Sequence, residues 1–256
     1  MKLNRAAFIQ HLQKIACNGQ IEGAVFTGAF EAAALKEDHL LLVIAPALPK
    51  VAPLPGPVGV GDLGFFIRAL GFLSGQGNDA TNLQLTVEEH RIVVDEDERG
   101  SQYLLTAHPK TIGTAIAEGT VAKFLGKAPK GKGVPITQAL ITGVKTIFSG
   151  YKAEEVELHL EKKGGKVTVG SQSSNYAEFP VPELKVTGKE KPYTLLFGKH
   201  LVDVLSGISN FDAANILFGG PESFVIIEDG PYKYILSPRS RGAEGTSPEA
   251  EGGGGE

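Results

Sequence analysis

Cysteine is almost absent from this sequence of 256 residues, because Cys17 is the only one. No intramolecular disulfide can form, and a lone cysteine in an apolar stretch is typical of a structural thiol in a reducing compartment. Long hydrophobic runs are absent too, and polar side chains interrupt the first residues, unlike those of a signal peptide. These absences predict a cytoplasmic protein without a membrane partner.

Excess charge and catalytic motifs are also absent. The chain has 25 Lys and Arg against 29 Asp and Glu, a formal net charge of -4. Contact with nucleic acid would therefore depend on local basic patches. The histidines are scattered without metal-ligand spacing, and no G-x-S-x-G motif is present. We expect no metal, no cofactor and no catalytic residue, so the protein is predicted not to be an enzyme.

Two glycine-rich segments resemble nucleotide-binding motifs. Residues 59–64, GVGDLG, match the dinucleotide pattern but follow a proline-rich loop instead of a buried parallel strand. Residues 126–133, GKAPKGKG, nearly match a phosphate-binding loop but end in glycine where a hydroxyl would bind Mg²⁺. We interpret the first as a loop before a helix and the second as a basic linker. A dinucleotide-dependent oxidoreductase stays a minor alternative.

Helical periodicity recurs along the chain. Phe8, Leu12 and Ile15 are at helical spacing after Asn4, a candidate cap. Between the helical segments lie short apolar runs with turn signals at 164–165, Gly-Gly, and 229–230, Asp-Gly, which predict antiparallel hairpins. The other helical patterns lie in residues 62–73, 134–148 and 199–209.

The second half of the sequence repeats the first. Residues 103–106, YLLT, precede 234–237, YILS, by 131 positions. The helical apolar set of the first segment precedes a similar set, Leu140, Val144 and Ile147, by 132 positions. Two pairs with nearly one offset predict an internal duplication.

The duplication divides the chain into two domains. We predict domains at 1–110 and 135–239, joined by a connector at 111–134 that is rich in Gly and Lys. The acidic, glycine-rich tail at 240–256 has no large apolar residue and should be disordered.

With two similar halves that alternate helices and strands, residues 1–239 resemble DNA polymerase sliding clamps. Both the proliferating cell nuclear antigen (PCNA) type and the T4-like phage type are similar. Residues 223–239, SFVIIEDGPYKYILSPR, carry the most specific likeness, to the clamp C-terminus. Residues 167–175, VTVGSQSSN, the opening MKL and residues 62–73, DLGFFIRALGFL, look like the phage clamps in particular.

The resemblance implies an α+β DNA-clamp fold with two similar domains, each with two helices packed on antiparallel sheets. Three chains would close a ring around double-stranded DNA, bound without sequence preference. Such a ring is a processivity factor that tethers a DNA polymerase and is opened by an ATP-dependent clamp loader. It would act at the nucleoid, or in the host cytoplasm if the protein is viral. A β-rich structural or virion assembly protein is the main alternative.

Three sets of residues follow from the resemblance. DNA-facing candidates are basic or polar, although helix solubility alone would also explain them: Lys2, Arg5, His11, Lys14, Arg68, Lys145 and Lys199. Candidates for a pocket that binds partner peptides are Leu40, Phe124, Leu125, Tyr234, Leu236, Ser237 and Pro238, of which Tyr234 and Leu236 could instead be core residues. At the subunit interface, Gln102, Leu104 and Leu105 of one subunit would pair with Val167, Val169 and Ser171 of the next.

Overall fold

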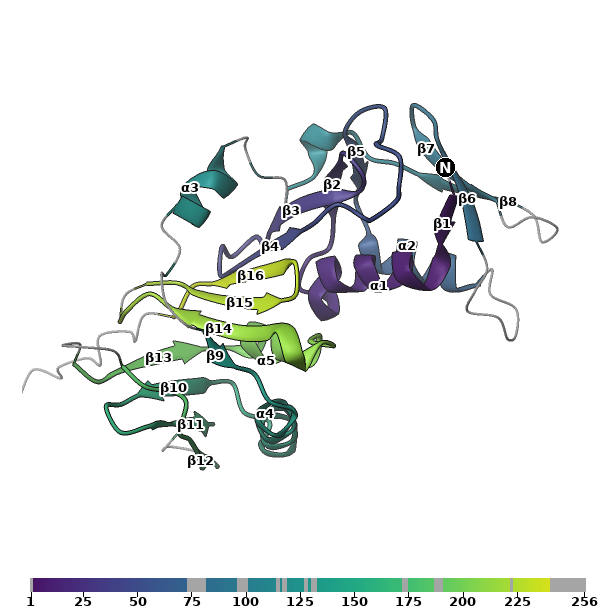
Figure 1. Cartoon of the computed structure of the whole chain (residues 1–256). Coiled ribbons are helices and arrows are strands. Elements are labelled where there is room, and N and C mark those ends of the chain that lie inside the picture. Colours follow the sequence, from purple (N-terminus) through teal and green to yellow (C-terminus); the bar gives the residue numbers. More distant parts are fainter. Residues whose placement is uncertain are drawn as a thin grey trace, which may run out of the picture.

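The chain repeats one structural unit four times, and each unit is a strand, a helix and three more strands (Figure 1). The computed structural model describes residues 2–72, 82–95, 101–113, 116, 119–126, 129, 133–171, 175–186, 191–221 and 223–239. Within these residues, no helix is long and apolar enough to cross a membrane.

The first two units form the first half of the molecule. Unit one consists of β1 (Lys2–Asn4), α1 (Arg5–Ala16), β2 (Ala24–Thr27), β3 (Glu31–Leu35) and β4 (Leu41–Ala45). Unit two consists of β5 (Val58–Val60), α2 (Leu63–Phe72), β6 (Asn82–Val87), β7 (Arg91–Asp95) and β8 (Ser101–Leu105). Between the halves lie the short helices η3 (Pro109–Thr111) and α3 (Thr120–Gly126).

The last two units form the second half. Unit three consists of β9 (Val134–Pro135), α4 (Gln138–Tyr151), β10 (Val156–Leu160), β11 (Gly165–Val169) and β12 (Ala177–Val181). Unit four consists of β13 (Tyr193–Phe197), α5 (Lys199–Ser206), β14 (Ala214–Phe218), β15 (Val225–Asp229) and β16 (Tyr232–Leu236). Two further short helices are η1 (Cys17–Gly19) and η4 (Phe211–Ala213). The segments with a shared sequence offset, α1 with α4 and β8 with β16, take equivalent places in the two halves.

The units exchange their first strands. β1 pairs with β6 and β5 with β2, and in the second half β9 pairs with β14 and β13 with β10. Every pairing between named strands is antiparallel, as the hairpin signals predict. Each half is thus two interlocked units.

One large sheet joins the halves. β4 and β16 pair antiparallel and complete an eight-stranded sheet in the order β5-β2-β3-β4-β16-β15-β14-β9. Two four-stranded sheets, β1-β6-β7-β8 and β12-β11-β10-β13, belong to the first and the second half. Their outer strands β8 and β12 lie at opposite ends of the molecule (Figure 1).

Local sequence explains where the helices begin and end. The side chains of Asn4, Asp62 and Thr137 each accept a hydrogen bond from the backbone N–H three residues later, at 2.9, 2.6 and 3.2 Å. Such side chains satisfy N–H groups that have no partner within the helix. Helix α1 ends where Cys17 and Asn18 adopt left-handed φ angles of 45° and 54°, a usual helix stop.

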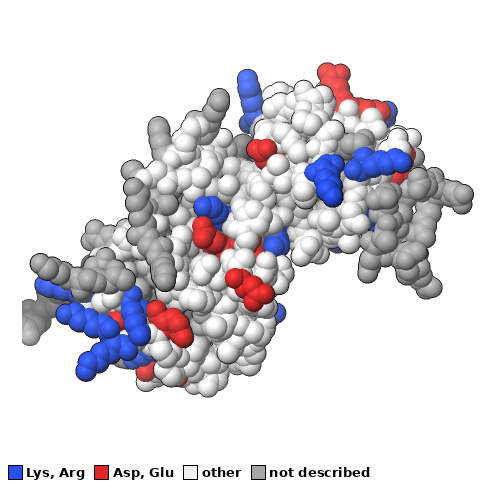
Figure 2. All heavy atoms as spheres, in the orientation of Figure 1, with Lys and Arg blue, Asp and Glu red and all other residues white. Residues whose placement is uncertain are grey.

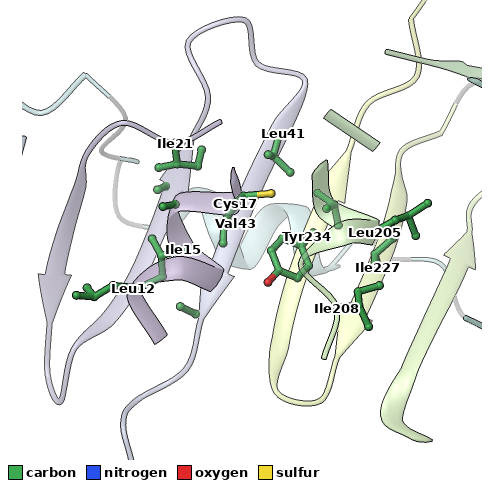
Figure 3. Packing of buried hydrophobic residues seen from close by; sticks show 14 of the residues in the cluster. Leu12, Ile15, Cys17, Ile21, Leu41, Val43, Leu205, Ile208, Ile227 and Tyr234 are labelled. Carbon is green, nitrogen blue, oxygen red and sulfur yellow. The ribbon is translucent and has the colours of Figure 1, made fainter. Parts of the chain in front are cut away.

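A single hydrophobic core lies between the helices and the sheets and continues across both halves. Figure 3 shows Ile15 and Val43 of the first half and Leu205, Ile227 and Tyr234 of the second as neighbours around the β4–β16 junction. A smaller set of buried residues lies outside this core: Leu42, Ile226 and Ile235. We call this set the outer apolar cluster.

Candidate nucleic-acid and partner interfaces

The helices α1, α2, α4 and α5 are net positive because they contain few acidic residues. Their sequences hold five basic residues and one acidic residue, a net charge of +4, whereas the whole chain carries -4. The rest of the chain must therefore carry -8. Helix α1 contacts β4 and α2, while α5 contacts β16 and α4, so the four helices form one layer beside the central sheet (Figure 1). We call the exposed side of this layer the helical face.

Four of the predicted DNA-facing residues are exposed. Arg68, Lys145 and Lys199 project from helices, and Lys2 lies on β1. Lys199 is 66% exposed but forms a 2.8 Å ion pair with Asp203. The other exposed polar positions of these helices are neutral and include Gln10, Gln13, Thr142, Thr146 and Ser149. The helical face is therefore only weakly basic.

Arg5 was expected to face DNA, but the structure buries it at 6% exposure. Its Nε donates a hydrogen bond to the Leu70 carbonyl at 3.1 Å, and a terminal guanidinium nitrogen donates to the Gly71 carbonyl at 3.3 Å. Carbonyls at a helix C-terminus have no partner within the helix and attract positive charge. Arg5 thus joins α1 to the end of α2, which sequence periodicity does not reveal.

His11 is likewise buried, at 1% exposure, so its expected place on a DNA-facing surface is wrong. Its Nε2 lies 2.8 Å from the Phe30 carbonyl and its Nδ1 lies 2.8 Å from the Tyr232 hydroxyl. Burial lowers the pKa of His11 below its usual value. The neutral ring links α1 to β16 of the other half.

Lys14 is also turned inward, because its side chain is only 11% exposed and its Nζ lies 2.8 Å from Asp229 Oδ2. The Asp229 side chain is 0% exposed. Neither carboxylate oxygen has a partner at good hydrogen-bond geometry among the described residues, so charge attraction dominates this contact. Lys14 Nζ also lies 4.5 Å from the centre of the Tyr232 ring. Together these contacts hold α1 against the β15–β16 hairpin.

A hollow of about 830 Å³ opens on the helical face between α1, α2 and the end of α5. Lys14 and Arg68 lie on its wall, but Glu22 and Asp62 do as well. The balanced charges give the hollow no preference for phosphate over a cation.

The outer apolar cluster lies on the face of the central sheet opposite the helices. Its three buried residues contact partly buried side chains that include Phe124 and Leu125 of α3. The rings of Phe124 and Phe224 meet edge to face with centroids 6.1 Å apart. The connector helix thus covers apolar surface at the junction between the halves.

Tyr234 and Leu236 do not reach the outer apolar cluster, contrary to the pocket prediction. Side chains alternate faces along a strand, and both residues are buried in the main core at 2% and 0% exposure. The Tyr234 hydroxyl donates to the Lys14 carbonyl at 3.4 Å. The intervening Ile235 faces outward instead.

The other predicted pocket residues stay near the outer face. Ser237 N–H donates to the Leu40 carbonyl at 3.0 Å, next to the half-buried Pro238. Leu42, Ile226 and Ile235 were not predicted, although the alternation of β16 could have suggested the last of them.

β8 is an outer strand, as its predicted interface role requires. Thr106 N–H donates to the His90 carbonyl at 2.9 Å. Hydrogen bonds alternate along an antiparallel pair, so the N–H groups of Tyr103 and Leu105 point to the free edge. The side chains of Tyr103 and Leu105 are 62% and 84% exposed, whereas Leu104 is buried. The Gln102 side chain is outside the described part of the structure.

The expected partner strand, β11, is not an edge. β11 lies between β10 and β12, and its residues Val167 and Val169 are both 0% exposed. Ser171 follows β11 and is half-buried. The free edge of this sheet belongs to β12, which a hairpin prediction alone could not show. The exposed Tyr176 directly precedes it.

The nucleotide-binding look-alikes lack the geometry that they would need. Gly59 lies on β5, which pairs antiparallel with β2 instead of following a parallel strand. A Cβ at Gly59 would lie 2.5 Å from the Ala107 carbonyl oxygen, so close approach of two backbones explains this glycine. Most of residues 126–133 is outside the described residues. Where side chains are described, no group of three or more His, Cys, Asp or Glu could hold a metal.

Comparison with solved structures identifies the fold. No protein-family profile matches the sequence, and no curated relative matches it. The structure of A. fulgidus PCNA bound to the C-terminal region of FEN-1 superimposes with a TM-score of 0.65 at 13% identity, covering 94% of this chain and 98% of that one. PCNA from Entamoeba histolytica gives 0.63 at 13% identity, covering 93% and 97%.

A bacterial protein has a similar structure but a longer chain. The DNA polymerase sliding clamp from Caulobacter crescentus gives a TM-score of 0.66 at 18% identity. The match covers 93% of this chain but only 65% of the bacterial chain. The present chain therefore has the sliding-clamp fold and the length of the PCNA-type chains.

Proposed function

We propose that this protein is a sliding clamp, a non-enzymatic ring that encircles double-stranded DNA and tethers a DNA polymerase. The observation that carries the proposal is the pair of free edge strands, β8 and β12, at opposite ends of a chain with the clamp fold (Figure 1). An unpaired edge presents free N–H and C=O groups that favour pairing with another strand. Contacts between two different surfaces of identical chains close into rings when the rotation permits.

Three chains per ring agree with the PCNA type, whose chains this one matches in length. The helices would then line the hole. The few basic side chains that stay exposed on the helical face attract phosphates without reading bases, because phosphate contacts carry no sequence information. Lys2, Arg68, Lys145 and Lys199 are the candidates for this contact.

The weak charge of the helical face makes topology more important than affinity. A linked ring holds its polymerase at high effective concentration even when each contact with DNA is weak. Closed rings need opening, so we assign that step to a separate ATP-dependent clamp loader.

The test is solution mass together with retention on DNA. Three chains of 27.0 kDa give about 81 kDa by light scattering. After loading, the ring should stay on circular DNA and be lost when the circle is cut. A monomer that is indifferent to DNA ends would contradict the proposal.

The ring contact has its own variant. Leu105→Pro removes an N–H at the free edge of β8 without removing a hydrogen bond to β7, so it should yield monomers. Tyr151→Glu, at an exposed aromatic residue on α4, is the matched control and should leave the ring intact. A stable trimer of Leu105→Pro would exclude β8 as the contact.

The outer apolar cluster and the adjacent Leu40, Ser237 and Pro238 form the proposed polymerase-binding surface. The structure of A. fulgidus PCNA holds the C-terminal region of FEN-1, which agrees with a role in binding a segment of a partner protein. Pro238→Glu should weaken polymerase binding in a pull-down while the ring mass stays unchanged. Unchanged binding would place the contact elsewhere.

A further inference from the structure

Four exposed lysines lie at the same end of the sheet β12-β11-β10-β13. The β10–β11 turn carries Lys162 and Lys163, and the backbone of Lys185 forms a parallel β-bridge with that of Glu161 beside them. Lys191 lies two residues before Tyr193, which pairs with Leu160 at the same end of β10. We call Lys162, Lys163, Lys185 and Lys191 the lysine cluster.

None of these four lysines has an ion-pair partner among the described residues. Figure 2 shows Lys and Arg gathered at the end of the molecule where Figure 1 places β10, β11 and β13. Counting only the described residues, the nearby acids Glu161 and Glu183 leave this end with a net charge of +2. The cluster is thus an unneutralised cationic surface.

The end of the described chain runs toward the lysine cluster. Arg239 forms an antiparallel bridge with Leu196 of β13, and its N–H donates to the Leu196 carbonyl at 2.8 Å. An antiparallel strand that continues from Arg239 moves toward the start of β13. Lys191 lies five residues before Leu196, and Glu244 lies five residues after Arg239. At about 3.3 Å per extended residue, each stretch would span about 17 Å, so an extended continuation of this pairing would bring Glu244 opposite Lys191.

Residues 240–256 have the complementary charge. They contain four glutamates and one arginine, a net charge of -3: Glu244, Glu249, Glu251, Glu256 and Arg241. Their composition offers no large apolar side chain, so contact with the protein would depend on charge. The bridge between Arg239 and Leu196 fixes the start of this segment beside β13.

We propose that the lysine cluster is an anion-binding surface whose occupant is the acidic segment 240–256 of the same chain. Glu244 meets Lys191, and the later glutamates contact Lys162, Lys163 and Lys185. The tether at Arg239 raises the effective concentration of the glutamates, which offsets the weakness of each exposed contact. Salt screens such contacts. The occupied state therefore holds at low salt and opens as ionic strength rises.

The test is zero-length carbodiimide cross-linking of the full chain, followed by mass spectrometry. At low salt, the tail glutamates should cross-link to the lysine cluster at least tenfold more than to Lys50, Lys110 and Lys152, which are exposed elsewhere. The preference should disappear in 0.5 M salt, because a Debye length on the order of 3–5 Å screens contacts between exposed charges. Even cross-linking over all lysines would overturn the proposal.

Two variants and one mixing experiment complete the test. Replacing the four tail glutamates with glutamine removes the side-chain carboxyls of the tail and should remove the cross-links at these four positions. A second variant changes all four lysines of the cluster to Ser and carries a fluorescent label at the end of the tail. At low salt, the mobility of this label should rise to the level that the labelled unmodified protein shows in high salt. Unchanged mobility would contradict the proposal. Cross-links mainly between isotopically mixed chains, or lysine protection by added duplex DNA instead of the tail, would also overturn it.

This inference does not depend on ring formation. Cross-linking within one chain is measured equally in a monomer or in a ring. If the protein were not retained on circular DNA, the contact between the tail and the lysine cluster could still be present. Equally, failure of the cross-linking test would leave the sliding-clamp proposal unaffected.

Discussion

The buried ion pair between Lys14 and Asp229 should hold the two halves of the chain together. Lys14 lies on α1 of the first half and Asp229 on β15 of the second, with side chains 11% and 0% exposed. Removing one partner leaves the other charge buried without compensation. Lys14→Met tests this with little change in side-chain volume.

The expected loss is large because of the burial. Breaking a buried pair costs about 3–5 kcal/mol. At about 2–4 °C per kcal/mol for a chain near this size, Lys14→Met should lower Tm by about 6–20 °C. The lost contact between Lys14 and the Tyr232 ring adds to the cost in the same direction.

A matched control exists on the same hairpin. Lys233 forms a 3.1 Å ion pair with Glu228, but its side chain is 38% exposed and that of Glu228 is 28% exposed. Water already screens such a pair, which is typically worth about 0–1 kcal/mol. Lys233→Met should therefore shift Tm far less than Lys14→Met.

The assay is thermal and urea unfolding at one fixed protein concentration, because assembly also stabilises the folded chain. A third variant, Lys14→Met with Asp229→Leu, removes both charges and should recover most of the loss. If Lys14→Met matches Lys233→Met, the ion pair does not join the halves. If the double variant is no better than Lys14→Met, lost packing explains the effect and the charge argument fails.

Three more predictions concern single buried groups. Burial, with Arg239 nearby, lowers the pKa of His200 to about 4 from 6.5. The unfolded chain therefore binds the proton more strongly than the folded chain. The neutral histidine contributes its full stability above pH 6.5, and about 3 kcal/mol of folding free energy is lost as the pH falls toward 4. Urea unfolding should show a smaller loss over this range for His200→Leu, and an identical loss would contradict the assignment. Gly59→Ala should destabilise the protein by about 1–3 kcal/mol because its Cβ would meet the Ala107 oxygen. Gly56→Ala is the control and should be nearly neutral, because a Cβ there meets nothing within 4 Å. Equal unfolding midpoints for the two variants would refute this prediction. Burial raises the pKa of the Cys17 thiol to about 12, so a disulfide reagent at pH 8 should label it only as fast as the chain opens, and rapid labelling of the native protein would show that the site is accessible.

Features determined by short stretches of sequence could be predicted well. Asn4 caps α1 as its position before the apolar periodicity predicts, because capping depends on neighbours within one turn. Gly164 allows the β10–β11 turn with a φ angle of 121°, and Gly230 serves the β15–β16 turn with 59°. The sequence offset of the two halves corresponds to equivalent elements, since a duplicated sequence folds into a duplicated structure.

The tertiary structure alone decided which surfaces are free. Arg5 and Lys14 look like solvent-facing helix positions, yet the end of α2 and the β15–β16 hairpin cover them. The edge strand is β12 instead of β11 because a further strand, which no local signal assigns to an edge, pairs with Val167 and Val169. In β16 the sequence predicts that side chains alternate between two faces, but it does not say which of the two faces the helices cover. A sequence determines local conformation through neighbouring residues, whereas burial of a face depends on which other elements pack against it, wherever they lie in the sequence.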